Sequence, residues 1–343
     1  MRLTTSIKTA LVSLASSLAL SSIAAHAQTE LKVYTALETE QLAEYAREFN
    51  KAYPEIHIKW VRDSTGIVTA KLLAEKANPQ ADAVWGLAAT SLLILKDEQM
   101  LETYAPEGVT NLSPKFRDNS AQPSWVGMNA WMGALCFNTI EAKKLGLPKP
   151  TSWEDLTKPI YKGHIVMPNP ASSGTGFLDV SSWLQLFGDQ KGWDYMTRLH
   201  DNIARYTHSG SKPCKLAAAG ETPIGISFAY KGASLKKKGA PLDVVFPKEG
   251  LGWDMEAAAI VKGTQNLEAA KKLMDFAVSK AANEMYNKNF AVVAMPGVAK
   301  PIQYYPANPE TLMIDNRFDW AAQNRTAILA EWQTRFDGKS DPK

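Results

Sequence analysis

The sequence predicts an α/β protein folded into two lobes, each a mixed sheet flanked by helices. Strand-like and helix-like segments alternate from residue 31 onward, which is typical of a largely parallel sheet. The alternation restarts near residue 131, and a chain of 343 residues is too long for one simple core. Open sheets of this kind bind ligands beyond the carboxyl ends of their strands. We therefore expect two sheets with a crevice between them.

The first residues predict an export signal. Arg2 and Lys8 form a basic start, and an apolar, small-residue stretch runs to about residue 25. Ala25-His26-Ala27 then matches the A-x-A pattern of a signal peptidase site. We expect cleavage between Ala27 and Gln28, release into the periplasm and, because no Cys stands at the junction, no lipid anchor. Serines interrupt the stretch and no stop-transfer flank follows, which argues against the alternative of a membrane anchor.

Composition narrows the class of protein. The formal net charge is +3, and it moves closer to zero when the basic leader is removed. A near-neutral chain has no electrostatic footprint for nucleic acid or an anionic membrane. The hydrophobic fraction of 45% is ordinary for a globular protein, and no second apolar stretch is long enough to span a bilayer.

The first half begins with clear strand and helix patterns. Residues 31–35 are expected to form a buried strand, and apolar residues recur at helical spacing over 38–53. Pro54 ends that helix. The next expected elements are a strand at 56–60, a helix opened by Ser64-Thr65-Gly66, a strand at 81–85 and a helix at 89–100.

The second half repeats the alternation. Strands are expected at 131–138, 164–167, 224–228, 242–246 and 257–261. Helices are expected at 153–156, with Thr151 or Ser152 as N-cap, and at 178–188, 192–204, 215–220, 267–279, 281–289 and 319–336.

The chain contains two cysteines, Cys136 and Cys214. In an oxidising compartment two thiols most often form a disulfide, and we expect that pairing here. Two separate buried thiols are the alternative.

Several segments resemble a known family. Val33-Tyr34-Thr35-Ala36, Ala81-Asp82-Ala83-Val84-Trp85 and the stretch 220–226 (GETPIGI) are similar to the ferric-type group of periplasmic binding proteins. Within that group, the stretches 168–176 (PNPASSGTG) and 209–214 (SGSKPC) resemble the 2-aminoethylphosphonate-binding proteins. The resemblance covers nearly the whole mature chain.

This resemblance implies a fold and partners. The fold would be the type II periplasmic-binding-protein fold, with the ligand in the cleft between the lobes. After the signal peptide at 1–27, lobe 1 would comprise 28–135, lobe 2 would comprise 136–247, and 248–343 would return to lobe 1 and supply the C-terminal helices. The closed protein, a monomer without cofactor, would deliver its ligand to an ABC permease in the inner membrane.

Two turns rich in small residues are candidate anion sites. Ser64 and Thr65 open one expected helix, and Ser172, Ser173, Gly174 and Thr175 precede another. Helix N-termini present unpaired N–H groups and a positive dipole end to anions, and hydroxyls add donors. Plain N-capping is the alternative. Ser211, in a loop followed by Pro213, could close on the same anion, or could belong to an ordinary polar turn.

Tyr230 follows the expected strand 224–228. Ferric-binding relatives place two adjacent tyrosines at this point, whereas the sequence here has Ala229-Tyr230-Lys231. A single phenol provides poorly for ferric iron, so we expect Tyr230 to donate its O–H to an anionic oxygen. A packing role is the alternative.

Acidic and aromatic residues could bind an amine and its linker. Leu37 and Glu38 directly follow the first strand, and Asp254 and Glu256 precede the strand at 257–261. An ammonium favours a desolvated carboxylate or an aromatic face, and Trp85 could supply that face. Helix capping by Glu38 and core packing of Trp85 are the alternatives.

The sequence lacks the motifs of common enzymes: no H-E-x-x-H, G-x-S-x-G, P-loop or C-x-x-C is present. We therefore expect no catalysis and no metal site. The favoured function is capture of 2-aminoethylphosphonate by lobe closure for an ABC importer. The alternatives are ferric iron, another small phosphonate, a phosphate ester or a polyamine.

Overall fold

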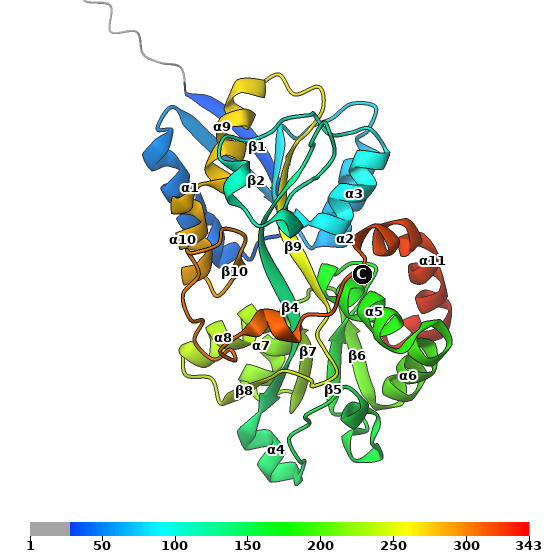
Figure 1. The fold of residues 1–343 in the computed structure, drawn as a ribbon. Coiled ribbons are helices and arrows are strands. Elements are labelled where there is room, and N and C mark those ends of the chain that lie inside the picture. The colour runs from blue at the N-terminus through cyan, green and yellow to red at the C-terminus, as the bar shows by residue number, and fades with distance from the viewer. Residues whose placement is uncertain (1–27, 343) are drawn as a thin grey trace, which may run out of the picture.

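The computed structural model describes residues 28–342, so the expected leader and its cleavage site lie outside the described residues. The described chain forms two lobes of mixed α/β structure that are joined by two long strands (Figure 1). None of the helices within residues 28–342 has the length and apolar character needed to cross a bilayer.

Lobe 1 contains the first three strands and the helices around them. The sheet order is β2-β1-β3-β9-β4, in which β1 is parallel to β2 and β3 while β9 is antiparallel to β3 and β4. The strands are β1 (Thr29–Thr35), β2 (Ile56–Arg62), β3 (Ala83–Ala88) and β9 (Trp253–Ile260). The helices are α1 (Thr39–Ala52), α2 (Thr65–Ala74), α3 (Ala89–Asp97), α9 (Leu267–Val278) and α10 (Lys280–Lys288).

Strand β4 (Val126–Asn138) belongs to both lobes. Its first part pairs with β9 as far as Met132, and with the short β10 (Val292–Val293). From Gly133 onward it pairs with β7 and, along its far side, with β8. The N–H of Gly133 donates to the carbonyl of Gly252 at 2.9 Å, just before β9 begins. The two connecting strands therefore meet at a pair of glycines.

Lobe 2 is built on the second part of β4. Parallel strands continue the sheet in the order β7-β5-β6. The strands are β5 (Ile165–Pro168), β6 (Ile203–Thr207), β7 (Ile224–Phe228) and β8 (Leu242–Val245). The helices are α4 (Thr139–Leu145), α5 (Gly174–Phe187), α6 (Asp189–Asn202), α7 (Lys212–Ala219) and α8 (Ala229–Lys237).

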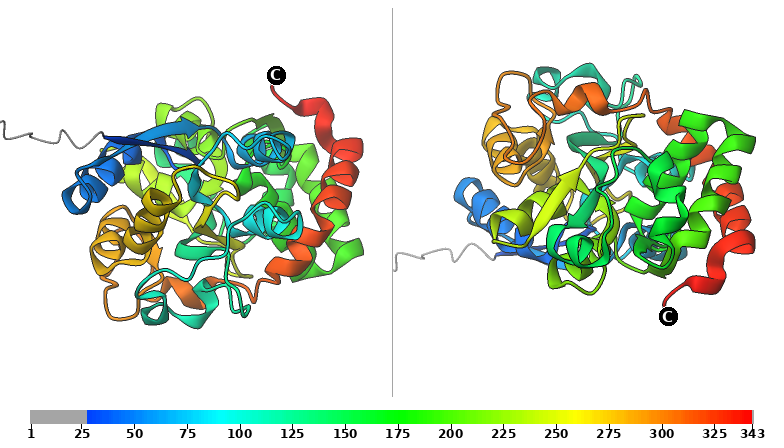
Figure 2. Two further views of the ribbon diagram at one scale, coloured as in Figure 1. Left: turned by 90° about the horizontal axis from the view of Figure 1, so that it is seen from above. Right: turned by 90° about the horizontal axis from the view of Figure 1, so that it is seen from below.

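The last helix, α11 (Phe318–Phe336), packs against α3 of lobe 1 and α5 of lobe 2. It runs along one side of the molecule in both views of Figure 2, next to the helices of lobe 2. The buried guanidinium of Arg325 lies 4.3 Å from the ring centre of Phe177 in α5. The last helix therefore contacts both lobes.

Some elements differ from the sequence prediction. Helix α5 begins at Gly174 and not at 178, because Ser173 caps it by accepting the N–H of Gly176 at 3.3 Å. The predicted helix 192–204 ends at Asn202, and β6 begins at Ile203. Helices α4 and α8 and strands β6 and β10 were not predicted. Residues 154–157 form a 3-10 turn. Ser152, which precedes this turn, accepts a hydrogen bond from the N–H of Asp155 through its Oγ.

The two cysteines are joined. A disulfide connects Cys136 on β4 to Cys214 on α7, with the two Cα atoms 5.3 Å apart. It lies in a small apolar cluster within lobe 2 and ties the crossing strand to the helix that follows the loop at 208–211.

Candidate ligand-binding cleft

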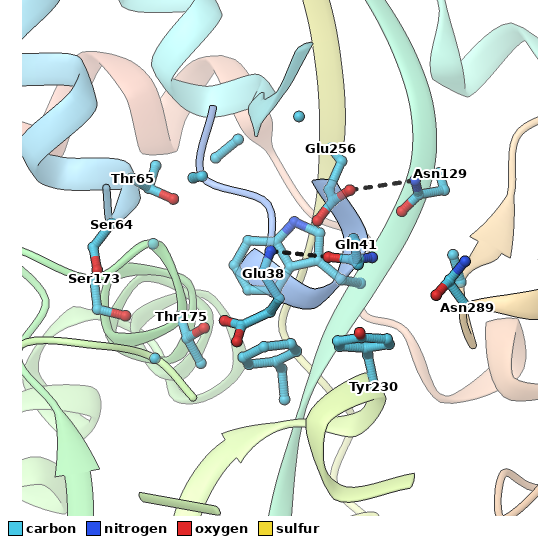
Figure 3. A pocket seen from close by; sticks show the side chains of 18 of the residues that line it. Glu38, Gln41, Ser64, Thr65, Asn129, Ser173, Thr175, Tyr230, Glu256 and Asn289 are labelled. Atoms are coloured by element: carbon cyan, nitrogen blue, oxygen red, sulfur yellow. Dashed lines mark hydrogen bonds between the residues drawn. The ribbon is translucent and has the colours of Figure 1, made fainter. Parts of the chain in front are cut away.

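A cleft that is partly open to solvent lies between the lobes. Lobe 1 contributes the ends of β1, β2 and β3 with the starts of α1 and α2, while lobe 2 contributes the starts of α5 and α8 and the loop after β6. Figure 3 shows hydroxyl side chains from both lobes at one end of the cleft and acid and amide groups at the other. The two ends have different chemistry.

The hydroxyl end is formed by two helix N-termini that face each other across the cleft. Ser64 and Thr65 lie at the start of α2, and Ser173, Gly174 and Thr175 lie at the start of α5. Within the described residues, the first-turn N–H groups of Thr65, Gly174 and Thr175 have no hydrogen-bond acceptor. Unpaired first-turn donors and two converging helix dipoles favour a bound anion.

The lobes touch directly beside this end. The N–H of Gly66 in α2 donates to the carbonyl oxygen of Ser172 at 3.0 Å. A Cβ built on Gly174 would lie 2.5 Å from Thr65 Oγ1, so only glycine lets the two helices approach this closely. Arg62 and Ser209 also line the cleft, and Arg62 adds a positive charge that the sequence analysis had not expected.

Glu256 and Asn129 define the opposite end, on the adjacent strands β9 and β4. Asn129 Nδ2 donates to Glu256 Oε2 at 3.5 Å (Figure 3). Burial, with a smaller contribution from the charge of Glu38, raises the pKa of Glu256 to about 7. No basic side chain among residues 28–342 forms an ion pair with it. Glu256 can therefore accept a hydrogen bond from a ligand hydroxyl or ammonium.

Aromatic rings form the wall between the two ends. Phe228 and Tyr230 are stacked, with ring centres 5.9 Å apart and planes at 13°, and Trp131 meets Phe228 edge-on at 6.0 Å. Tyr230 lies in the first turn of α8, where burial and neighbouring acids raise the pKa of its phenol well above 10. The phenol therefore stays protonated, as a hydrogen-bond donor. No group of three or more His, Cys, Asp or Glu side chains in the described chain is arranged to hold a metal ion.

Glu38 lines the cleft, but its charge is already paired. Its carboxylate lies 2.8 Å from Lys231 Nζ and 3.7 Å from both Arg62 and Lys215. The backbone N–H of Glu38 also donates to Gln41 Oε1 at 2.9 Å (Figure 3). The structure thus gives Glu38 three cationic neighbours, whereas the sequence analysis expected a free acceptor for an amine.

Five of the predicted contact residues lie outside the cleft lining. Leu37 is fully buried, and Trp85 is a core residue that stacks on Trp60 at 5.6 Å and donates a hydrogen bond to the Tyr286 hydroxyl.

The other three are polar residues that already have partners within the protein. Asp254 accepts hydrogen bonds from Ala89 N–H and Thr90 Oγ1 on α3. Ser172 Oγ donates to the carbonyl of His208, and Ser211 Oγ is paired with Ser209 Oγ. The aromatic rings that line the cleft include those of Phe228, Tyr230 and Trp131, but not that of Trp85.

Several lining residues were not predicted. They are Gln41, Arg62, Asn129, Trp131, Phe228 and Asn289. Arg62 could have been found, since it ends the strand just before the Ser64 turn. Asn129 and Trp131 alternate along β4 and have no local motif, because their exposure to the cleft depends on how β4 passes between the lobes.

The comparisons with known proteins agree with this architecture. Residues 87–326 match the family of bacterial extracellular solute-binding proteins, and the chain belongs to this family. A protein of Haemophilus influenzae without an assigned function is 30% identical over 96% of both chains. A protein of Salmonella paratyphi A whose name proposes 2-aminoethylphosphonate binding is 24% identical over 66% of both chains.

The chain is also similar to solved structures of periplasmic binding proteins. The structure of the periplasmic binding protein AfuA from Actinobacillus pleuropneumoniae, with exogenous fructose-6-phosphate bound, has a TM-score of 0.85 and 31% identity. The match covers 91% of this chain and 99% of AfuA. The fold is therefore that of type II periplasmic binding proteins, and the protein is the solute-binding component of an ABC importer. The family consists of transport proteins and not enzymes.

Proposed function

We propose that the protein captures a small organic phosphate or phosphonate, with the phosphoryl group between the N-termini of α2 and α5. The observation that carries this proposal is the pair of facing first turns, in which the N–H groups of Thr65, Gly174 and Thr175 have no acceptor among the described residues. A phosphoryl group offers three acceptor oxygens to donors converging from two sides. Arg62 would balance part of its charge.

The remainder of the cleft favours a phosphorylated sugar. A sugar body presents hydroxyls, which suit the carboxyl of Glu256 and the amides of Asn129, Gln41 and Asn289 at the far end. The stacked Phe228 and Tyr230 would contact the apolar face of such a ring. The likeness to a structure with fructose-6-phosphate bound supports this choice.

A second candidate is 2-aminoethylphosphonate, for which one observation speaks directly. Glu256 is an acid without a basic partner among the described residues, and a ligand ammonium could provide that partner. The Salmonella relative also points toward this ligand. Glu38 does not strengthen the candidate, because Lys231 already neutralises it. Ferric iron and polyamines are less well supported, since one protonated phenol and an anion-binding end suit neither.

Calorimetry on the mature protein, purified without refolding, tests the proposal. The panel contains fructose-6-phosphate, glucose-6-phosphate, 2-aminoethylphosphonate, inorganic phosphate, putrescine and ferric citrate. We expect a sugar phosphate to bind most tightly and inorganic phosphate to bind weakly, because it leaves the far end unfilled. Tight binding of putrescine or ferric citrate, with no binding of any phosphorus compound, would refute the proposal.

Glu256→Gln separates the two candidates. The substitution keeps an acceptor for a sugar hydroxyl but removes the charge that an ammonium needs. Above pH 7 we expect it to weaken 2-aminoethylphosphonate binding by roughly 10- to 100-fold, the equivalent of one hydrogen bond to a charged group, and to change sugar-phosphate binding much less. Glu284→Gln, at an exposed position on α10, is the matched control. Equal losses for both ligands would contradict this assignment of Glu256.

A further inference from the structure

Lys231 is a buried cation that does not line the cleft. It lies in α8 of lobe 2, and its side chain is 1% exposed. A buried ammonium is costly unless it is paired. Lys231 has two acidic partners, Glu38 and Glu40, and both belong to lobe 1. Its charge is therefore satisfied across the boundary between the lobes.

The geometry of this contact is close. Lys231 Nζ lies 2.8 Å from Glu38 Oε2 and within hydrogen-bond reach of Glu40 Oε1. Lys215, on α7 of lobe 2, reaches Glu38 at 3.7 Å from the more exposed side. Burial raises the pKa of Glu40, but the hydrogen bond and charge of Lys231, a backbone hydrogen bond and the charge of Lys215 together keep that pKa below its usual value. Two cations of lobe 2 thus face two acids at the start of α1.

We propose that Lys231 is a positioning residue that latches the lobes together and fixes the carboxylate of Glu38 at the cleft wall. Separation of the lobes would remove both acids from Lys231, whereas the pairs at Arg62–Glu38 and Lys236–Asp243 lie within one lobe and would persist. The latch therefore favours only the closed form. This role is independent of which ligand fills the cleft.

Small-angle X-ray scattering and calorimetry on Lys231→Met and Glu40→Gln test the latch. Glu40 is 39% exposed at its side chain and does not line the cleft, so Glu40→Gln is expected to fold even if Lys231→Met does not. Scattering is recorded without ligand and with saturating fructose-6-phosphate. We expect both variants to have a larger radius of gyration than the wild type in at least one condition. Where fructose-6-phosphate binds, we expect about 10- to 100-fold weaker affinity.

Two matched variants control for general loss of charge. Lys236→Met removes another lysine of α8 that pairs within lobe 2, and Glu48→Gln removes another acid of α1 that pairs within lobe 1. Both should behave as the wild type. The double variant Lys231→Met/Glu40→Gln should be no more open than Lys231→Met alone, since both changes break the same contact.

The latch proposal would be overturned if Lys231→Met and Glu40→Gln both gave the same radius of gyration as the wild type, with and without ligand. If fructose-6-phosphate does not bind to any of the proteins, the ligand assignment fails, but the scattering without ligand still decides the latch. The two proposals can therefore fail separately.

Discussion

The buried acids of this protein are stabilised in different ways. Glu38 is surrounded by three cations, and Asp254 is held by donors at the start of α3 while burial raises its pKa to about 6. Asp179 on α5 has no hydrogen-bond partner for either carboxyl oxygen among the described residues, and burial raises its pKa far above the usual value. Glu256 has a pKa of about 7, so its charge changes within the physiological range.

The raised pKa of Glu256 predicts a pH-dependent stability. Below about pH 4.5 the carboxyl is protonated in both the folded and the unfolded chain. Between that value and pH 7 the unfolded chain releases the proton more readily, so the free energy of unfolding falls as pH rises. Glu256→Gln should therefore stabilise the ligand-free protein at pH 8 but not at pH 4. Asp254 and Asp179 act in the same direction and remain in the variant.

Thermal unfolding at the two pH values measures this effect. The midpoint of Glu256→Gln should exceed that of the wild type at pH 8, and the difference should shrink toward zero at pH 4. Glu284→Gln, at an exposed position, should show no such change. A constant difference between Glu256→Gln and the wild type at both values would contradict the assigned pKa shift.

At the scale of elements, α5 connects the cleft to the crossing strands. Its first turn forms half of the proposed anion-binding end, while Asp179 and Ser182 farther along the helix lie against the glycines where β4 and β9 meet. A Cβ on Gly133 would lie 2.6 Å from Asp179 Oδ1, and a Cβ on Gly252 would lie 2.4 Å from Ser182 Oγ. The same helix therefore contacts both the ligand site and the point where the lobes join.

The disulfide between β4 and α7 predicts a stability effect without a binding effect. It closes a loop whose ends are 78 residues apart, for which the chain-entropy model gives roughly 4 kcal/mol. Replacing Cys136 and Cys214 together by alanine should lower the free energy of unfolding by up to this amount. Ligand affinity should stay unchanged, because neither residue lines the cleft.

Denaturant unfolding at equilibrium measures the loss in the free energy of unfolding. Calorimetry on the same sample measures ligand affinity and so tests whether the cleft is intact. An unchanged unfolding midpoint would show that the cross-link does not stabilise lobe 2. A large loss of affinity would show that the disulfide also holds the loop containing Ser209.

At the scale of the whole molecule, the proposed capture of a ligand depends on how closely the lobes approach. The lobes are in backbone contact at Gly66, where a Cβ would lie 2.1 Å from the carbonyl oxygen of Ala171. Gly66→Ala should therefore prevent full closure while leaving each lobe intact, since alanine favours the helical conformation of α2. We expect at least about tenfold weaker ligand binding, the equivalent of roughly 1.4 kcal/mol, and a thermal midpoint close to that of the wild type.

Gly338→Ala is the control for this prediction, because a Cβ at that position meets nothing within 4 Å. Calorimetry with the ligand identified from the panel compares the affinities of the wild type, Gly66→Ala and Gly338→Ala. Wild-type affinity in Gly66→Ala would mean that the ligand is held in a more open arrangement of the lobes.

The amino-acid sequence by itself determined the alternation of strands and helices, the two-lobed class and the small-residue turns at Ser64 and Ser173. These features follow from local periodicity and capping, which short stretches of chain encode. The predicted helix start at 178 was wrong by one turn. Glycine is unfavourable inside helices, so Gly174 and Gly176 did not indicate a helix, although the Ser173 cap stabilises a first turn there. The turn itself was identified as a candidate anion site.

Only the tertiary structure decided which of the candidate side chains face the cleft. Asp254 and Glu256 are two residues apart on β9, yet one is bound to α3 and the other lines the cleft. The sequence suggested that the carboxylate of Glu38 was free to bind an amine, but in the folded protein it is paired with Lys231. Such pairings join segments far apart in the sequence, and their free energy depends on burial and distance. For that reason local patterns could suggest candidate site residues, whereas the partners of each charge depended on the packing of the two lobes.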